Sequence, residues 1–367
     1  MGASPTPSLS LSTGATMPLI GFGTWGLQPP DLQPALQAAL ATGYRLFDLS
    51  PLYANEAHVG RVFSDAIAAG TVRREDLFLT SKAPPLATCD SAKLFAACRE
   101  TLRQLGTTYV DLYLIHWPFC VKGDAWPPDA SARLPFSHAA LHSAWEAMEA
   151  LHAAGLARAI GISNVGPRRL QALLHTARVP PAVVQVELHP YLANLELRSL
   201  AARQRPPIRV TAYCSLGSAA RPAKYQHDSD PLLLQDPVLL HVASAHSTSS
   251  AAVALAWALR HSVAVIPKSS RPPHVRANLR APLALAPRLT ASEMAAIDAL
   301  DRNHRFLAAG WRVFAWRPDL TLDELVDDPP QSSLPPTSSH LLVWLLLAAA
   351  VAGGLLSASR RHRGGAR

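Results

Sequence analysis

Cysteine is scarce in this chain, which has four cysteines among 367 residues. Cys89, Cys98, Cys120 and Cys214 form no Cys-x-x-Cys pair, and no histidine stands beside them at the spacing of metal ligands. These observations argue against a framework of disulfides and against a zinc site of the usual sequence patterns. We predict a protein of a reducing compartment, with no bound metal.

Charge is also sparse, because charged residues make up 16% of the chain and hydrophobic residues 49%. Such a composition can build a large core and excludes a chain that is disordered throughout. The formal net charge is +8, but Arg360, Arg361, Arg363 and Arg367 all lie within the last eight residues. No other basic cluster alternates with aromatic residues, so we predict no binding of nucleic acid.

Short apolar runs alternate with segments of helical spacing, a pattern typical of strand–helix units around a parallel sheet. A hairpin over 9–17 precedes eight predicted strands, at 19–22, 44–48, 77–81, 110–116, 158–163, 183–187, 209–213 and 263–267. Predicted helices include 31–42, 56–69, 91–105, 137–154, 167–176, 194–204, 249–260 and 290–300. The pattern predicts an α/β fold, a (βα)8 TIM barrel with its active site beyond the strand ends. An open doubly wound sheet is less favoured, because no Gly-x-Gly-x-x-Gly follows the first strand.

The alternation stops after residue 318. Residues 319–340 are rich in proline and serine, as in a linker, and residues 341–358 carry no charge. This uncharged run is of marginal length for a transmembrane helix, and the basic tail 359–367 follows it. We expect an N-terminal tail (1–8), the barrel (9–318), the linker, a transmembrane helix and the basic tail. The alternative is an alanine-rich helix that packs on the barrel, or a plain tail.

A secretion signal is not indicated, because residues 1–14 lack both a basic start and an apolar run. A transmembrane helix at the far end of such a chain would be inserted after synthesis. We therefore expect a cytoplasmic catalytic domain that is tail-anchored to an intracellular membrane. The arginines beyond the segment run against the positive-inside tendency, so the sequence does not identify that membrane.

Four side chains fall at the ends of neighbouring predicted strands. Asp48 ends the second strand, Tyr53 lies in the loop after it, Lys82 follows the third strand, and His116 stands at the end of the fourth. The interval from Asp48 to Lys82 equals that from Lys82 to His116, so adjacent strands would present them at one mouth of the barrel. Each residue alone has an ordinary structural explanation. Together they favour an active site, because ionisable groups are costly to gather in one place.

These residue types suit the reduction of a carbonyl group. Hydride transfer to the carbonyl carbon builds negative charge on the oxygen, which needs an acid as the charge forms. Tyrosine, with a pKa of about 10, is a weak acid at neutral pH. We expect Lys82 to lower the pKa of Tyr53 by stabilising the phenolate, and Asp48 to hold the lysine in place. His116 would orient and polarise the carbonyl through a hydrogen bond.

Five segments, in this order, resemble the aldo-keto reductase superfamily, and the resemblance covers about residues 9–306. They are MPLIGFGTW at 17–25, GYRLFD with YANE at 43–48 and 53–56, DLYLIHWP at 111–118, GISN at 161–164, and IPKSS at 266–270. The resemblance, which is to the aldose and aldehyde reductase type, implies an NAD(P)H-dependent oxidoreductase that reduces aldehydes or ketones to alcohols. It also implies that Tyr53 is the proton donor and that Asp48, Lys82 and His116 are its catalytic partners.

The resemblance further implies that a nicotinamide cofactor lies extended across the strand ends. Its expected contacts are Ser163, Asn164 and Gln185 at the carboxamide, Tyr213 on the ring, Leu216 and Ser218 at the pyrophosphate, and Lys268, Ser269, His274 and Asn278 at the adenosine end. Trp25 and Trp117 would wall the substrate pocket, where planar apolar surfaces suit hydrophobic carbonyls.

The chain departs from the family at the cofactor end. An arginine is common six residues after the lysine of the IPKSS segment, where this chain has His274. A neutral imidazole holds a 2′-phosphate less well than a guanidinium does. Ala277 likewise replaces an acidic or amide residue that often contacts adenine. Because Lys268 remains and either Arg271 or Arg276 could compensate for the missing arginine, we expect NADPH as the cofactor, with NADH as the alternative.

The segment 301–318 is where we expect substrate specificity, since loops of this fold carry it. Its aromatic residues Phe306, Trp311, Phe314 and Trp316 either close over a substrate or pack on the barrel. The sequence identifies no particular substrate, and we expect a small carbonyl compound and a monomer. A hypothesis from another class is a cofactor-binding regulatory subunit or redox sensor with little turnover, which the complete catalytic set disfavours.

Overall fold

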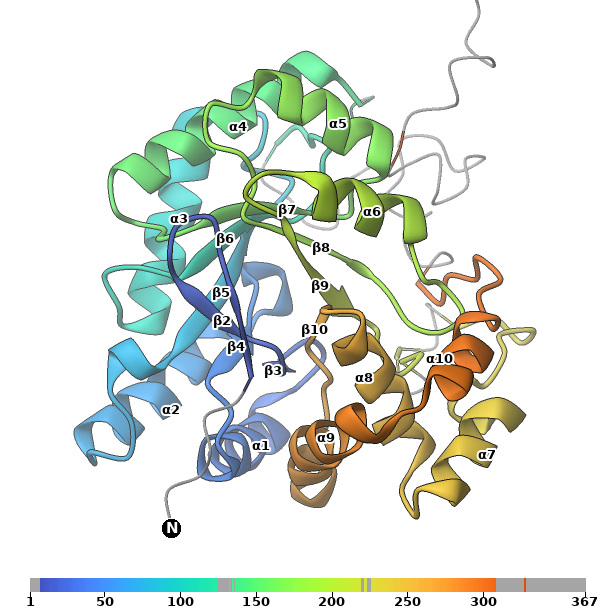
Figure 1. Cartoon of the computed structure of the whole chain (residues 1–367). Coiled ribbons are helices and arrows are strands. Elements are labelled where there is room, and N and C mark those ends of the chain that lie inside the picture. Colours follow the sequence, from blue (N-terminus) through green and yellow to red (C-terminus); the bar gives the residue numbers. More distant parts are fainter. Residues whose placement is uncertain are drawn as a thin grey trace, which may run out of the picture. The chain divides into compact units, whose positions relative to one another are not determined.

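Eight parallel strands form the centre of the computed structural model, which describes residues 7–123, 132, 134, 136–218, 221–222, 226–307 and 327 (Figure 1). They are β3 (Gly21–Gly23), β4 (Leu46–Asp48), β5 (Phe78–Ala83), β6 (Leu112–Ile115), β7 (Ile160–Ser163), β8 (Val183–Glu187), β9 (Arg209–Tyr213) and β10 (Ala264–Val265). Each strand pairs with the next in the chain, and a parallel bridge between Ile20 and Val265 joins the two edges of the sheet. This closure fits the predicted α/β TIM barrel, and the open doubly wound sheet is wrong.

Helices surround the strands (Figure 1). They are α1 (Pro29–Thr42), α2 (Glu56–Ala68), α3 (Ser91–Leu105), α4 (His138–Ala153), α5 (Pro167–Thr176), α6 (Leu195–Arg203), α7 (Pro237–Ala245), α8 (Ser250–Arg260), α9 (Pro272–Leu285) and α10 (Ala291–Asp298). Helix α3 shows why such segments form. The Asp90 carboxylate caps its first backbone N–H groups, an apolar face at helical spacing is buried, and Gly106 ends the helix in the left-handed conformation.

The predicted hairpin is present as β1 (Ser8–Ser10) and β2 (Thr16–Pro18), paired antiparallel. Its buried side chains Leu9 and Met17 pack against residues that begin the barrel strands, namely Leu46, Phe78, Leu112 and Val183. The hairpin therefore covers the amino-terminal end of the barrel. In this fold the active site lies at the opposite end of the barrel, where the strands end.

The segment after the last helix is described in part. Phe306 is buried, with its ring 4.9 Å from His189 and stacked on Tyr191, so this aromatic residue packs on the barrel. Asp327 is also buried, and its carboxylate accepts the N–H of Arg169 near the start of α5. Trp311, Phe314 and Trp316 lie outside the described residues.

The linker 319–340 apart from Asp327, the candidate transmembrane segment 341–358 and the basic tail 359–367 also lie outside the described residues. Among the helices that the structure does describe, none is by itself both long and apolar enough to cross a membrane. Helices α7 and α8 meet that test only when taken together, and a bend of 91° separates them. The domain boundaries at 318 and 340 stay predictions.

Candidate active site

Three neighbouring strands and one short turn bring the predicted catalytic side chains together. Asp48 is the last residue of β4, Lys82 lies one residue before the end of β5, and His116 directly follows β6. Tyr53 ends a single 3-10 turn, η1 (Pro51–Tyr53), which begins where the Ser50 hydroxyl accepts the N–H of Leu52. The turn folds the chain back over the end of β4, so that Tyr53 reaches the lysine of the next strand.

Lys82 is the centre of the site, and its side chain is buried. The ammonium Nζ donates to Asp48 Oδ1 at 2.6 Å, to the Leu49 carbonyl at 2.9 Å and to the Tyr53 hydroxyl at 3.2 Å. Three acceptors match the three N–H bonds of an ammonium. The second carboxylate oxygen of Asp48 accepts Gln185 Nε2 at 2.6 Å, which ties β4 to β8 across the barrel.

The expected direction of the Tyr53 pKa was wrong. Burial raises the pKa of Tyr53 well above 10, and the negative charges of Asp48 and Glu56 act in the same direction. Burial also lowers the pKa of Lys82, while contact with Asp48 opposes that shift. The phenol therefore keeps its proton at neutral pH. Because its oxygen accepts from Lys82, the proton can be donated to a further acceptor, and the nearby lysine stabilises the phenolate that results.

His116 is held as a neutral imidazole. Burial lowers its pKa well below 6.5, and the charge of Lys82 adds to the effect. Its Nδ1 lies 3.1 Å from Ser50 Oγ. The oxygen of Ser50 also accepts the N–H of Leu52, and it can either donate its proton to Nδ1 or accept one from it. The first arrangement leaves the imidazole proton on Nε2, where it can be donated to a ligand. The His116 and Tyr53 rings are 6.0 Å apart and meet edge to face.

The candidate residues for the nicotinamide end are joined to the catalytic set by hydrogen bonds. Asn164 Nδ2 donates to the carbonyl of His116 at 2.8 Å and to Ser163 Oγ at 3.2 Å, and its Oδ1 accepts the hydroxyl of Tyr213 at 2.6 Å. Two of these residues have a left-handed backbone conformation, with a φ of 58° at Asn164 and 42° at Ser218. Such strained conformations are frequent where a chain must hold a ligand, so the backbone here fits a cofactor.

The other cofactor candidates lie further along the same end of the barrel. Leu216 and Ser218 follow β9, Lys268 and Ser269 follow β10, and His274 and Asn278 lie on α9. His274 is exposed, whereas Asn278 is buried. Burial lowers the pKa of Lys268, with Asp31 acting in the opposite sense. A phosphate beside this half-buried ammonium would offset that cost, so Lys268 fits an anionic group.

The two candidate tryptophans differ in their surroundings. Trp117 is buried and lines a small cavity with Phe119, Cys120 and Leu141, close to His116. Trp25 lies in the loop after β3 and is half-buried. This cavity has room for about one water molecule, and none of Tyr53, Lys82 and His116 lines it, so it lies beside the expected substrate pocket.

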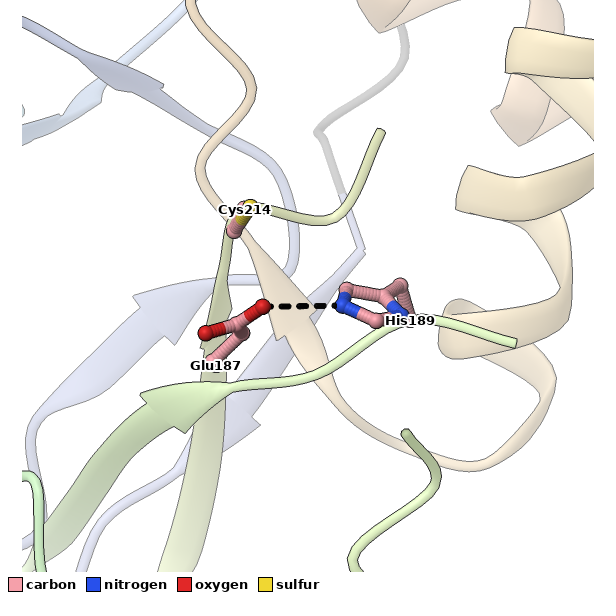
Figure 2. Close-up of side chains that lie close together, drawn as sticks. All are labelled: Glu187, His189 and Cys214. Carbon is pink, nitrogen blue, oxygen red and sulfur yellow. Dashed lines mark hydrogen bonds and ion pairs between the residues drawn. The ribbon is translucent and has the colours of Figure 1, made fainter. Parts of the chain in front are cut away.

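One cluster beside the site was not predicted (Figure 2). Glu187, His189 and Cys214 each bring a potential metal ligand within 4.8 Å of the other two, and the expectation of no metal did not consider them. Glu187 Oε1 already accepts His189 Nε2 at 3.1 Å and the N–H of Phe306 at 2.6 Å, and Oε2 accepts the N–H of Leu307 at 3.4 Å. We interpret the cluster as the anchor of the segment after α10.

The fold and the site define a class of protein: a (βα)8 barrel with a lysine, tyrosine and histidine gathered at the carboxyl ends of its strands. A model of the Aldo/keto reductase family matches residues 19–302. The chain therefore belongs to this family of oxidoreductases.

Several relatives are similar over most of their length. An aldo/keto reductase of Synechocystis sp. is 41% identical over 319 residues, which are 87% of this chain and 95% of the relative. Aldo-keto reductase family 1 member A1 of Rattus norvegicus is 39% identical over 304 residues, 82% of this chain and 91% of the relative. A probable NAD(P)H-dependent D-xylose reductase of Aspergillus clavatus is 39% identical over 311 residues, which are 82% of this chain and 92% of the relative.

Proposed function

We propose that this protein is an NADPH-dependent reductase of aldehydes or ketones in which Tyr53 donates the proton. The observation that carries the proposal is the buried chain of contacts from Asp48 through Lys82 to the Tyr53 hydroxyl, at 2.6 Å and 3.2 Å. The printed names of the relatives, which include an NAD(P)H-dependent D-xylose reductase, support the same reaction class.

Each side chain has a part in the proposed reaction. When bound, the cofactor supplies a hydride to the carbonyl carbon. Tyr53 donates its phenolic proton to the carbonyl oxygen, and the ammonium of Lys82 stabilises the phenolate left behind. Asp48 keeps that ammonium in place. The neutral His116 donates an Nε2 hydrogen bond to the carbonyl oxygen and so lowers the energy of the charge that develops there.

The cofactor would be held by residues at the ends of β7 to β10. Ser163, Asn164 and Gln185 have the donors and acceptors that a carboxamide needs, and Tyr213 offers a flat ring. Lys268 supports the choice of NADPH, because its half-buried ammonium suits a phosphate group. We keep the proposal of a monomer.

A substitution of Tyr53 tests the reaction. Tyr53→Phe should lower kcat/KM for reduction of aromatic and aliphatic aldehydes about 100-fold or more, because the general acid is lost. Binding of NADPH, measured by quenching of protein fluorescence, should be unchanged. Tyr109→Phe is the matched control, because Tyr109 lies before β6, under Arg74 and Arg158. Near-normal activity of Tyr53→Phe would remove Tyr53 from the proposed role.

The same assay separates this proposal from the regulatory alternative. A redox sensor on the same barrel would bind NADPH but reduce none of a broad panel of aldehydes and ketones. Turnover of any of them at rates usual for enzymes, with a clear dependence on Tyr53, argues for the reductase.

A further inference from the structure

Two loops at the catalytic end lie side by side and each carries one cysteine. One loop joins β5 to α3 and includes Thr88 and Cys89, and the other follows His116 and includes Phe119 and Cys120. The Thr88 hydroxyl lies 3.0 Å from the carbonyl of Phe119, and the N–H of Val121 donates to the carbonyl of Pro85 at 3.3 Å. These bonds hold the two cysteines opposite each other.

The sulfurs of Cys89 and Cys120 lie close to one another, because each lies against a residue next to the other cysteine. Their neighbours agree with this placement: Cys89 Sγ lies 3.8 Å from the carbonyl of Val121, and the Thr88 hydroxyl lies 3.9 Å from Cys120 Sγ. Cys89 is exposed, whereas Cys120 is 7% exposed and lines the cavity beside Trp117. A small oxidant can therefore reach the first thiol directly.

The two thiols differ in acidity in the way that an attacking and a resolving cysteine do. The neighbouring thiol of Cys120 lowers the pKa of Cys89, burial opposes that shift, and the charge of Lys93 supports it. The neighbouring thiol of Cys89 and burial raise the pKa of Cys120. Cys89 is also the exposed member of the pair, whereas Cys120 is buried, so Cys89 ionises more readily, and a thiolate is the form that reacts with an oxidant.

We propose that Cys89 and Cys120 form an oxidisable dithiol that closes to a disulfide and shifts Trp117, which we expect to wall the substrate pocket. The Cys89 thiolate attacks one oxygen of a peroxide and becomes a sulfenic acid, with release of water after protonation. The sulfur of Cys120 then attacks the sulfenic sulfur, its proton leaves, and a second water is released. Two thiols are oxidised by two electrons, and one hydrogen peroxide is reduced to two waters.

Disulfide formation must move the cavity wall. A disulfide holds its sulfurs at about 2.05 Å, closer than the sulfurs of two free thiols can stand. Cys120 follows Trp117 and Phe119 in the chain after β6, and all three line the cavity with Thr88. Drawing the loops together displaces Trp117, which we expect to contact a hydrophobic carbonyl substrate. This second part rests on the proposed function, whereas formation of the disulfide does not.

The bond itself is tested by mass spectrometry of the whole protein after brief treatment with hydrogen peroxide. We expect a loss of two hydrogen atoms, a cross-linked pair of peptides containing Cys89 and Cys120, and reversal by dithiothreitol. Cys98→Ala is the matched control that should still form the bond, because Cys98 is buried in α3 and burial raises its pKa to about 12. Cys89→Ser and Cys120→Ser should not form it. Sulfinic acid on Cys89 alone, or a dimer linked through Cys89, would overturn the proposal.

The effect on the cavity is tested by kinetics on the reduced and oxidised protein. We expect oxidation to raise KM for aromatic aldehydes about tenfold, as when a pocket loses an apolar contact, with a smaller change in kcat. Dithiothreitol should restore KM, and peroxide should leave Cys89→Ser unchanged. A disulfide without any change in KM would overturn the second part. If the protein reduced no carbonyl at all, the proposed function would fail while the mass measurement still decided the dithiol.

Discussion

At the scale of single residues, we propose that the hydroxyl of Ser50 donates to Nδ1 of His116 and so keeps the imidazole proton on Nε2. Ser50→Ala removes the donor to Nδ1 and lets the imidazole adopt either tautomer. We expect kcat to fall about two- to tenfold, the amount that one neutral hydrogen bond of ~0.5–1.5 kcal/mol supports.

The control for this change is Ser50→Thr, which keeps a hydroxyl at the same position and should restore most of kcat. The affinity for NADPH should be the same in all three proteins, since Ser50 contacts the histidine and the turn of Tyr53. Equal loss of kcat in both variants would mean that Ser50 serves only to shape the turn.

The acidities of His116 and Tyr53 predict the pH dependence of the reduction. The pKa of His116 is below 6.5, so its Nε2–H donor is present above that pH and is not lost as pH rises. The pKa of Tyr53 is above 10, so its proton is retained until pH passes that value. We expect kcat to be flat from about pH 6.5 to about pH 10. A fall in kcat through neutral pH, measured with saturating NADPH, would instead indicate the acidic phenol that the sequence suggested.

Sequence reasoning placed the catalytic residues by their distance from strand ends but missed their neighbours. Asp48, Lys82 and His116 follow from a parallel sheet whose carboxyl ends share one edge. Ser50 and the Cys89–Cys120 pair depend on how loops meet after the barrel closes, and no spacing in the sequence encodes that. The acidity of Tyr53 was misjudged because the charge of Lys82 was weighed and burial was not.

Among the secondary-structure elements, the segment after α10 depends on one buried carboxylate. Burial alone would raise the pKa of Glu187, but the bonds from His189 and Phe306, with the charge of Arg305, leave it below 4.5. A lowered pKa means that the ionised form stabilises the fold. This contribution is present above pH 4.5 and is lost as pH falls through the folded-state pKa.

Glu187→Gln should therefore destabilise the protein at neutral pH, because an amide cannot accept all of these bonds. We expect a loss of about 1–3 kcal/mol in urea unfolding at pH 7 and a smaller difference from the wild type below pH 4. Glu100→Gln is the control, since Glu100 pairs with Arg103 on the surface and such pairs contribute little. An equal effect of both substitutions would argue against Glu187 as an anchor.

The elements themselves were predicted unevenly. Strands β8 and β9 and helices α3 and α5 have the predicted bounds, because their apolar patterns are bordered by clear start and stop signals. Helices α7 and α9 were not named. Helix α9 begins with two prolines and contains Pro282, and these prolines hid its helical pattern in the sequence. The first two are compatible with a helix, because proline is favoured in a first helical turn.

At the scale of the whole molecule, the proposed membrane anchor can be tested apart from the barrel. The chain ending at residue 336 keeps everything that the structure describes and removes the uncharged run 341–358. We expect the full chain to sediment with membranes and to resist extraction by alkaline carbonate, while the shorter chain stays in the supernatant with the same activity. Equal distribution of the two would remove the anchor and leave a plain tail.

The bridge between Ile20 and Val265 means that the barrel can close only late in synthesis of the chain. The chain must be made beyond β10 before the first and last strands can meet, whereas Asp48, Lys82 and His116 are made much earlier. Until Gln185 and the later strands arrive, the ion pair of Lys82 and Asp48 stands in water, and its burial comes with closure. In a ribosome-bound intermediate, the charges of Lys82 and Asp48 should therefore be hydrated. The site acquires its shifted pKa values only when the barrel has closed.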